Sequence, residues 1–303
     1  MAIVVGYTTQ ESGVSALELA GVLARSLREP LVVTVVLASP NIAGVSDLVD
    51  GDRVGPLTQW GESVLDGARA AVQPDVEASF QVRHASSIPT GLLESAADAG
   101  ASALVLGSSS KGSLGRISLG SIVDRLVHAA PLPLALAPRG FRSGPAARIR
   151  RVSIGYAGSE RGAHVVAAGA QLAQSVGADL RAVSLLVRPP QRLFGTIEPS
   201  ADDVVVDEWA ARTKAALETR LAATTATLGD GSVCPLAVGV GLSWREAIRD
   251  VPWSDGDLLV LGPSSAARAA RLFLGSRASK ILRSAPVPVL MVPAPRATRD
   301  GDP

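Results

Sequence analysis

The sequence predicts an α/β fold of two tandem doubly wound domains, each a five-stranded parallel sheet (order 3-2-1-4-5) with helices on both faces. The segment from Leu104 to Pro138 recurs 155 residues later with 14 of its 35 positions identical, so we expect one fold made twice. Each copy alternates short apolar runs with longer segments of helical periodicity, as in parallel sheets covered by helices. The 303 residues, 47% of them hydrophobic, suffice for two domains of about 150 residues.

In the first copy, the predicted strands are apolar runs rich in Val and Leu. They are expected at Ala2–Tyr7, Leu31–Ser39, Glu77–Ala85, Ala103–Gly107 and Leu132–Ala137. The predicted helices carry apolar residues every three or four positions. They are expected at Ser12–Arg28, Leu57–Val72, Ile88–Ala99 and Leu119–Ala129.

The second copy repeats this order, and its first strand again ends in a Gly-Tyr pair, at Gly155-Tyr156 as at Gly6-Tyr7. Its strands are expected at Arg151–Tyr156, Asp179–Val187, Val233–Val240, Leu258–Gly262 and Val287–Val292. Its helices are expected at Arg161–Val176, Val204–Thr227, Trp244–Val251 and Leu274–Ser284. Both fifth strands are rich in proline, which lacks an amide donor, so we place them at sheet edges.

The domain boundaries follow from the repeat, and we predict domains at residues 1–140 and 150–296. The connecting segment, Arg139–Arg150, contains Gly, Pro, Ser and four arginines. We interpret it as a solvated linker in preference to a basic binding patch. The residues after Pro293 show no periodicity and are expected to form a tail.

Composition excludes several function classes. The net charge is +1 and aromatic residues make up 3%, which argues against nucleic-acid binding. No apolar run approaches the ~20 residues that span a bilayer, and no secretory leader is expected, so we predict a cytoplasmic protein without membrane contact. The single cysteine, Cys234, is interpreted as a core residue, and Trp60 and Trp209 as packing residues. His84 ends a strand near the expected cleft, but no catalytic partner is apparent.

The loops after the fourth strands carry the functional signal. Gly107 ends an apolar strand, where a missing Cβ lets backbone approach a ligand, and the turn after it is expected to aim several amides at an anion. Thirteen residues later, Gly120-Ser121 opens a helix whose free amides favour phosphate. The second copy repeats this layout with Gly262 and Gly275-Ser276. Arg116, Arg271 and Lys111 lie in the same loops and are candidates for neutralising a phosphate.

On these residues the chain resembles the universal stress protein family in its tandem form. Nucleotide-binding members of that family carry Gly, two residues, Gly, nine residues, then Gly and Ser or Thr. Here the four positions are occupied by Gly107, Ser110, Gly120 and Ser121, and in the second copy by Gly262, Ser265, Gly275 and Ser276. Both copies therefore depart at the middle glycine. The family's aspartate at the end of strand one is also replaced, by Thr8 and Ala157.

The resemblance implies ATP as the ligand. The candidate nucleotide-binding residues are Thr8, Val36, Gly107, Ser109, Ser110, Gly120 and Ser121 in the first copy, and Ala157, Leu185, Gly262, Ser264, Ser265, Gly275 and Ser276 in the second. No catalytic or metal-ligating residue is proposed. The resemblance also implies that the two fifth strands pair within one chain, and that two chains could form a homodimer.

Three functional hypotheses remain open at this point. The leading one is a non-enzymatic stress-response protein whose shape or association is regulated by an adenine nucleotide. The second is a dimerising scaffold that has lost the nucleotide, which the four departures favour. The third is a slow ATPase, although the stretch after strand one lacks the Ser-Gly-Gly loop typical of ATP-cleaving relatives of this fold class.

Overall fold

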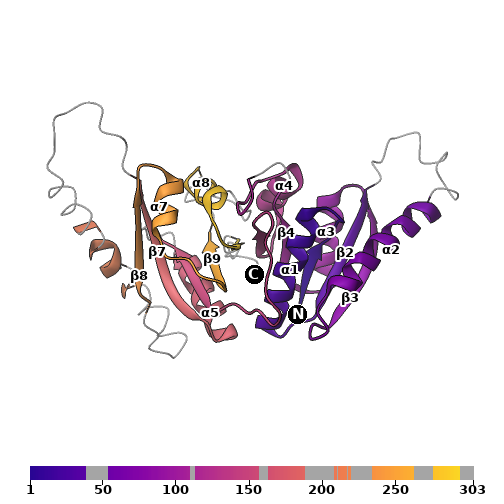
Figure 1. Ribbon diagram of the computed structural model, residues 1–303, viewed down its shortest axis with the longest axis horizontal. Helices are drawn as coiled ribbons and strands as arrows, with labels where there is room; N and C mark the ends of the chain where they lie inside the picture. Colours follow the sequence, from indigo (N-terminus) through magenta and orange to yellow (C-terminus); the bar gives the residue numbers. More distant parts are fainter. Residues whose placement is uncertain are drawn as a thin grey trace, which may run out of the picture. The chain divides into compact units, whose positions relative to one another are not determined.

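The computed structural model describes residues 1–38, 54–109, 113–156, 163–187, 208–209, 211–216, 218–219, 234–262 and 276–293. The chain divides by its internal contacts into two compact units, Met1–Arg148 and Ile149–Pro303. Figure 1 shows both units as mixed α/β structures, and each is described by itself.

The first unit contains a parallel sheet in the order β3-β2-β1-β4-β5, as predicted. Its strands are β1 Ala2–Gly6, β2 Leu31–Ala38, β3 Ala78–Ala85, β4 Ala101–Gly107 and β5 Leu134–Ala137. The last strand begins two residues later than predicted, directly after Pro133, because proline has no amide for the ladder.

The helices of the first unit are α1 Glu11–Leu27, α2 Val54–Ala71, α3 Ile88–Asp98 and α4 Ser121–Ala129. α1 and α2 pack on one face of the sheet, and α3 and α4, which contact each other, pack on the other. This is the doubly wound arrangement that the alternating pattern predicts. α4 starts two residues later than predicted because Gly120 is extended (φ −83°, ψ 170°) and precedes the first helical residue.

The second unit repeats the topology, with its strands in the order β10-β9-β6-β7-β8. The strands are β6 Arg151–Gly155, β7 Asp179–Val187, β8 Leu236–Gly241, β9 Asp257–Leu261 and β10 Val289–Met291. The helices are α5 Ala163–Val176, α7 Trp244–Asp250 and α8 Ser276–Ser284, and residues 208–209, 211–216 and 218–219 are also helical. The described strands and helices of the second unit thus follow the order of the first, as the resemblance to a doubled α/β fold implies.

The cores consist of aliphatic side chains from strands and helix faces. The largest fully buried ones include Ile3, Leu19, Leu65 and Leu104 in the first unit and Ile154 in the second. Cys234 is also buried, as expected, and desolvation raises the pKa of its thiol to about 12. None of the helices in the described residues combines the length and the apolarity that crossing a bilayer requires.

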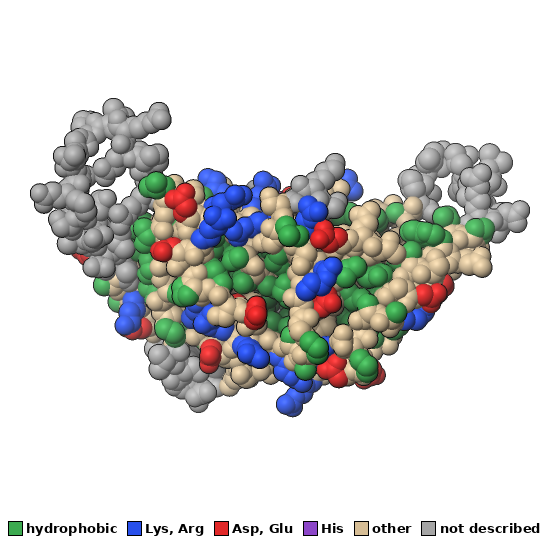
Figure 2. Space-filling model, viewed as in Figure 1, with side chains coloured by type: hydrophobic (Ala, Val, Ile, Leu, Met, Phe, Trp, Pro, Cys, Tyr) green, Lys and Arg blue, Asp and Glu red, His purple; other side chains and the backbone are tan. Residues whose placement is uncertain are grey.

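Trp60 is not the packing residue that the sequence suggested. Its side chain is 57% exposed on α2, and hydrophobic side chains are visible over that helix in Figure 2. The buried stripe of α2 consists instead of Val64, Leu65 and Ala68. The repeat between Trp60 and Trp209 marks common ancestry and did not indicate which face of the helix is covered.

A buried charged cluster closes the amino-terminal edge of the second sheet. Arg181 donates from Nε to Ser153 Oγ (2.8 Å) and from Nη2 to Asp257 Oδ2 (3.3 Å). Arg151 makes two bonds of 2.7 Å to the same carboxylate, and the Arg181 guanidinium lies 4.8 Å from the Trp253 ring centroid. The carboxylate of Asp257 thus has two guanidinium partners, as a buried charge requires.

The connecting segment is docked and not simply solvated. From Arg139 to Arg148 it runs along α1 within the first unit. The hydrogen bonds join Arg139 to Glu11, Arg142 to Ser15, Ser143 to Glu18 and Arg25 to the carbonyl of Ala147. In three of these bonds α1 supplies the acceptor, and in the fourth Arg25 of α1 is the donor. The partners are more than 100 residues apart in sequence, so no local pattern shows them.

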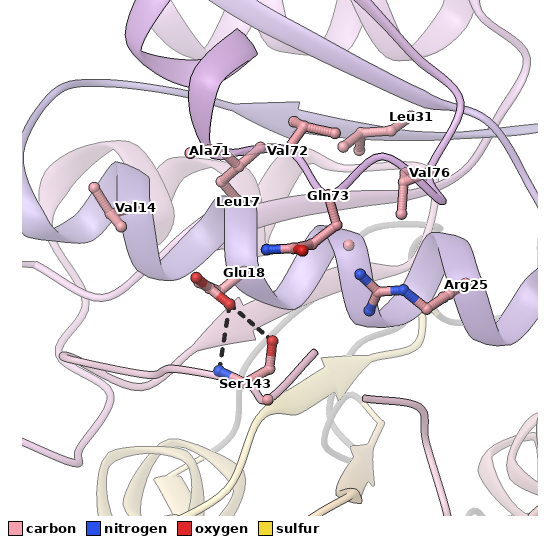
Figure 3. Close-up of a pocket in the computed structure, with 12 residues that line it drawn as sticks. Val14, Leu17, Glu18, Arg25, Leu31, Ala71, Val72, Gln73, Val76 and Ser143 are labelled. Atoms are coloured by element: carbon pink, nitrogen blue, oxygen red, sulfur yellow. Dashed lines mark hydrogen bonds between the residues drawn. The ribbon is translucent and has the colours of Figure 1, made fainter. Parts of the chain in front are cut away.

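Figure 3 shows a small cavity enclosed by this docked segment, α1 and the end of α2. Glu18, Arg25 and Gln73 surround it, and Glu18 accepts from both the amide and the hydroxyl of Ser143. Its volume of about 30 Å³ has room for little more than a water molecule. It lies outside the site that the sequence predicts.

Candidate functional site

A larger cavity of about 240 Å³ opens at the carboxyl ends of β1 and β4 in the first unit. These strands are neighbours, and the helices that follow them, α1 and α4, leave on opposite faces of the sheet. Ligands of doubly wound sheets bind at such a crevice. The cavity is lined by six of the predicted residues, Thr8, Val36, Gly107, Ser109, Gly120 and Ser121. Ser110 and Lys111 lie outside the described residues.

Gly107 has a packing role that the sequence did not reveal. A Cβ at this position would lie 1.9 Å from the carbonyl oxygen of Ser12, in the first turn of α1. Gly13 in turn packs against the backbone of Thr8, with 1.9 Å from its ideal Cβ to the Thr8 oxygen. Both glycines therefore let the start of α1 press against the strand ends, which brings the helix amides to the cavity.

The turn after Gly107 does not aim its first amides at the cavity, contrary to expectation. Ser108 N donates to Ala137 O (3.0 Å), which extends the pairing of β4 with β5. Ser109 N donates to Ser118 O (2.9 Å), and the buried Ser108 hydroxyl accepts from Ser118 N (2.6 Å). These bonds close the base of the loop, because buried amides need acceptors. They also fix where α4 begins.

Two helices start at the cavity without side-chain caps. The residues before α1 and α4, Gln10 and Gly120, make no capping bond. Among the described residues, the first amides of α4, from Ser121 to Val123, have no acceptor. α3 and α7 differ, because Ser87 and Ser243 accept from the amides of their own first turns. Uncapped amides at the positive end of two helix dipoles make this end of the cavity suited to an anion.

The rest of the cavity wall is apolar or uncharged. Val36, Ile88, Leu92 and Leu106 contribute aliphatic surface, and no charged side chain is among the described lining residues. Thr34, also at the wall, is occupied by Ser95 (2.7 Å between the two hydroxyl oxygens) and by Gln81 Nε2 (3.0 Å). Burial raises the pKa of the Tyr7 phenol above its usual value of 10.0, so this lining group is neutral at physiological pH. The arrangement thus pairs an apolar chamber with an anion-binding end.

Sequence reasoning missed part of this wall. Tyr7, Gln10, Ser12 and Gly13 follow β1 and line the cavity, as do Ile88, Leu92, Ser108, Ile122 and Val123. The Gly-Tyr pair and the following glycine recur in the second copy and were the available signal for the first group. Ile88 and Leu92 come from a helix far along the chain, and only the fold places them here. Arg116, a candidate for neutralising phosphate, is not among the lining residues.

In the second unit the structure describes Gly262, Leu185 and Ser276. Gly262 follows β9, and a Cβ there would lie 2.1 Å from Val165 Cγ2 of α5. Leu185 is half-buried in β7, and Ser276 is the exposed first residue of α8. The other predicted positions, Ala157, Ser264, Ser265 and Gly275, and also Arg271, lie outside the described residues.

No feature of the described residues adds catalytic or metal chemistry. His84 bonds through Nε2 to Thr58 Oγ1 (2.9 Å) on the exposed side of α2 and β3 and does not line the cavity. No group of three His, Cys, Asp or Glu side chains in the described part of the chain is placed to hold a metal ion.

The comparisons with known proteins agree with this fold. The universal stress protein family matches residues 1–138 and 148–293, once for each copy. Universal stress protein Rv2319c of Mycobacterium tuberculosis and Mb2346c of Mycobacterium bovis are each 32% identical over 304 residues, covering 97% of this chain and 100% of the relative. A universal stress protein structure from Archaeoglobus fulgidus superposes with a TM-score of 0.59 at 14% identity, covering 96% and 97% of the two chains, and supports the fold. The chain therefore belongs to the universal stress protein family, as two copies of the family domain in tandem.

Proposed function

We propose that the first unit binds an adenine nucleotide such as ATP, and that the protein acts in the stress response through binding and not through catalytic turnover. The observation that carries this proposal is the convergence of two uncapped helix starts, α1 and α4, on one cavity with apolar walls. Phosphate groups suit the first feature, and a purine base suits the second. The family membership supports the same ligand class.

The residues present fit such a ligand in specific roles. The amides of Ser121, Ile122 and Val123 would donate hydrogen bonds to phosphate oxygens. Gly120, directly before them, has no side chain that would block the phosphate. A Cβ at Gly120 would meet only Ser109, at 3.4 Å, so this glycine is tolerant of alanine. Val36, Leu92 and Leu106 would cover the base and the sugar. Thr8, exposed at the end of β1, offers a hydroxyl where a carboxylate is expected.

The test removes one amide from the anion end. Proline is accepted at the first position of a helix, and Gly120 already has the extended conformation that a residue before proline prefers. Ser121→Pro is therefore expected to weaken ATP binding about tenfold in titration calorimetry, from loss of one charge-assisted hydrogen bond. Ser121→Ala, which keeps the amide, isolates the hydroxyl.

Ser276→Pro is the matched change in the second unit, and we expect it to leave ATP affinity unchanged. Absence of heat with millimolar ATP, ADP and AMP, measured on folded wild-type protein, would remove the nucleotide from the function. Equal losses from Ser121→Pro and Ser276→Pro would show that the first unit has no special role.

A second candidate, a scaffold without nucleotide, is favoured by two observations. The cavity has no charged side chain among its described residues, and Thr8 stands where relatives place an aspartate. Mass spectrometry of the purified, denatured protein separates the two, because co-purified ATP excludes the scaffold. ATP hydrolysis that Ser121→Pro abolishes would support the third reading, a slow ATPase. Pairing of the fifth strands and homodimer formation stay predictions, testable by sedimentation.

A further inference from the structure

Arg139 links three parts of the first unit at the anion end of the cavity. Its amide donates to Arg116 O (2.9 Å) and its carbonyl accepts from Gly115 N (2.8 Å), so its backbone brackets the loop between β4 and α4. Its side chain donates from Nε to Glu11 Oε2 (2.8 Å) in the first turn of α1. The loop that leads to α4 and the start of α1 are thereby tied to one residue.

A tight turn holds Arg139 in this position. Phe141 N donates to Pro138 O (3.0 Å), which closes a four-residue turn directly after β5. Gly140 has a φ of +73°, and a Cβ there would lie 2.6 Å from Leu114 Cδ1 of the bracketed loop. Such a turn requires glycine at its third residue, so the backbone around Arg139 is set by local chemistry.

The carboxylate of Glu11 would repel an anion at the start of α1. Glu11 is the first residue of α1 and lies between Gln10 and Ser12, which both line the cavity. A carboxylate here stabilises the helix start but opposes a second anion at the same amides. Arg139 neutralises that carboxylate, and both side chains are about one-third exposed, so the field is only partly screened by water.

We infer that Arg139 is a positioning residue for the phosphate groups of the ligand: it compensates Glu11 and fixes the loop before α4. This inference rests on the proposed function and deepens it. Arg139 is not among the residues that line the cavity, so we expect it to act on the ligand through Glu11 and the loop backbone. Replacing Arg139 should therefore weaken the binding of the phosphate groups and leave the binding of the nucleoside part unchanged.

The test compares ATP with adenosine in calorimetric titrations of four variants of the full chain. Arg139→Met is expected to weaken ATP binding about tenfold, because an uncompensated carboxylate then faces the anion. Glu11→Gln is expected to tighten ATP binding about threefold by the same electrostatic argument, and the double variant to lie near wild type. Adenosine affinity should change by less than about twofold in all of them, since it carries no charge.

Arg142→Met is the matched control. Arg142 belongs to the same docked segment and bonds to Ser15 Oγ (3.3 Å), farther along α1 from the cavity, so its loss should change neither ligand's affinity. Weaker ATP binding in both Arg139→Met and Glu11→Gln would overturn the inference, because a purely structural ion pair gives losses of the same sign. Equal losses for ATP and adenosine would do the same.

A readout without ligand separates this inference from the proposed function. Hydrogen exchange at Gly115 should quicken in Arg139→Met and not in Arg142→Met, because the carbonyl of residue 139 accepts from that amide and the ion pair with Glu11 helps to hold residue 139 in place. Unchanged exchange at Gly115 would refute the positioning role. If wild-type protein binds no nucleotide while Gly115 responds as expected, the proposed ligand is wrong and the structural role of Arg139 stands.

Discussion

The two units share one topology but close the amino-terminal edge of their sheets in different ways. In the second, Arg151, Arg181 and Asp257 form a buried charged cluster. At the repeat-equivalent positions the first unit has Ala2, Val32 and Ser102, and the Ser102 hydroxyl bonds to Ala2 O and to Glu29. The same strand register thus accommodates either small side chains or a satisfied ionic network.

At the carboxyl-terminal edge of its sheet each unit has a glycine at the end of the fourth strand, but the two glycines have different neighbours. Gly107 faces the Ser12 carbonyl, whereas Gly262 faces the side chain of Val165. A backbone carbonyl cannot move without displacing its helix, whereas a side-chain contact can be relieved by a smaller local shift. The comparison teaches that a glycine kept in both copies can be essential in one and replaceable in the other.

The largest expected loss of stability tests the difference between the amino-terminal edges of the two sheets. Asp257→Asn leaves the buried guanidinium of Arg181 without its charged partner and removes two charge-assisted bonds from the partly exposed Arg151, and we expect it to lower the free energy of unfolding by about 3 kcal/mol. Ser102→Ala, its counterpart in the first unit, should cost less than about 1 kcal/mol. Urea denaturation, with the midpoint and the slope compared, measures both.

Replacing the whole network is the control for this prediction. Arg151→Met, Arg181→Met and Asp257→Leu together should restore stability to within about 1 kcal/mol of wild type, because the desolvation cost of the charges goes with them. If the triple variant is as unstable as Asp257→Asn, the attraction between these charges contributes more to the free energy of unfolding than their desolvation costs.

The next effect concerns the paired glycines. Gly107→Ala is expected to destabilise the protein by about 3 kcal/mol, because the added methyl group must displace the Ser12 carbonyl and the start of α1. Gly262→Ala should cost less, about 1 kcal/mol, since only the side chain of Val165 and not a helix backbone has to shift. Thermal unfolding of the two variants in parallel measures the difference, and equal losses would contradict the distinction between backbone and side-chain contact.

The smallest effect uses Cys234 as a reporter of the second unit alone. Burial raises the pKa of this thiol from 9.0 to about 12. The contribution of the thiol to the free energy of unfolding is therefore fully present below pH 9 and is lost as the pH rises towards 12, because the unfolded state loses its thiol proton first. At pH 8 a thiol reagent should react at least about 100-fold more slowly than with unfolded protein. Asp257→Asn should speed this labelling and Gly107→Ala should not; acceleration by both would mean that the units unfold together.

The fold was predictable because its signals are local and repeated. Alternating apolar strands and periodic helices indicated a parallel sheet, and every strand of the structure falls on a predicted run. Errors at strand and helix ends, as at Pro133 and Gly120, arose where one backbone group decides the boundary. Six lining residues of the first cavity were predicted from the glycine spacing and the family resemblance, whereas Ile88 and Leu92 were not, because they reach the cavity from a helix on another part of the sheet.

By itself, the sequence determined the doubled α/β architecture and the family, and it predicted the sheet edge at which we propose a ligand, because hydrophobic periodicity and glycine placement act through neighbouring residues. Only the tertiary structure decided which amides remain available, since those of Ser108 and Ser109 are taken by Ala137 and Ser118, while the first amides of α4 have no acceptor in the described part of the chain. It also decided that the linker lies on α1 and that Arg139 meets Glu11, because hydrogen bonds across 128 residues depend on the packed position of whole elements.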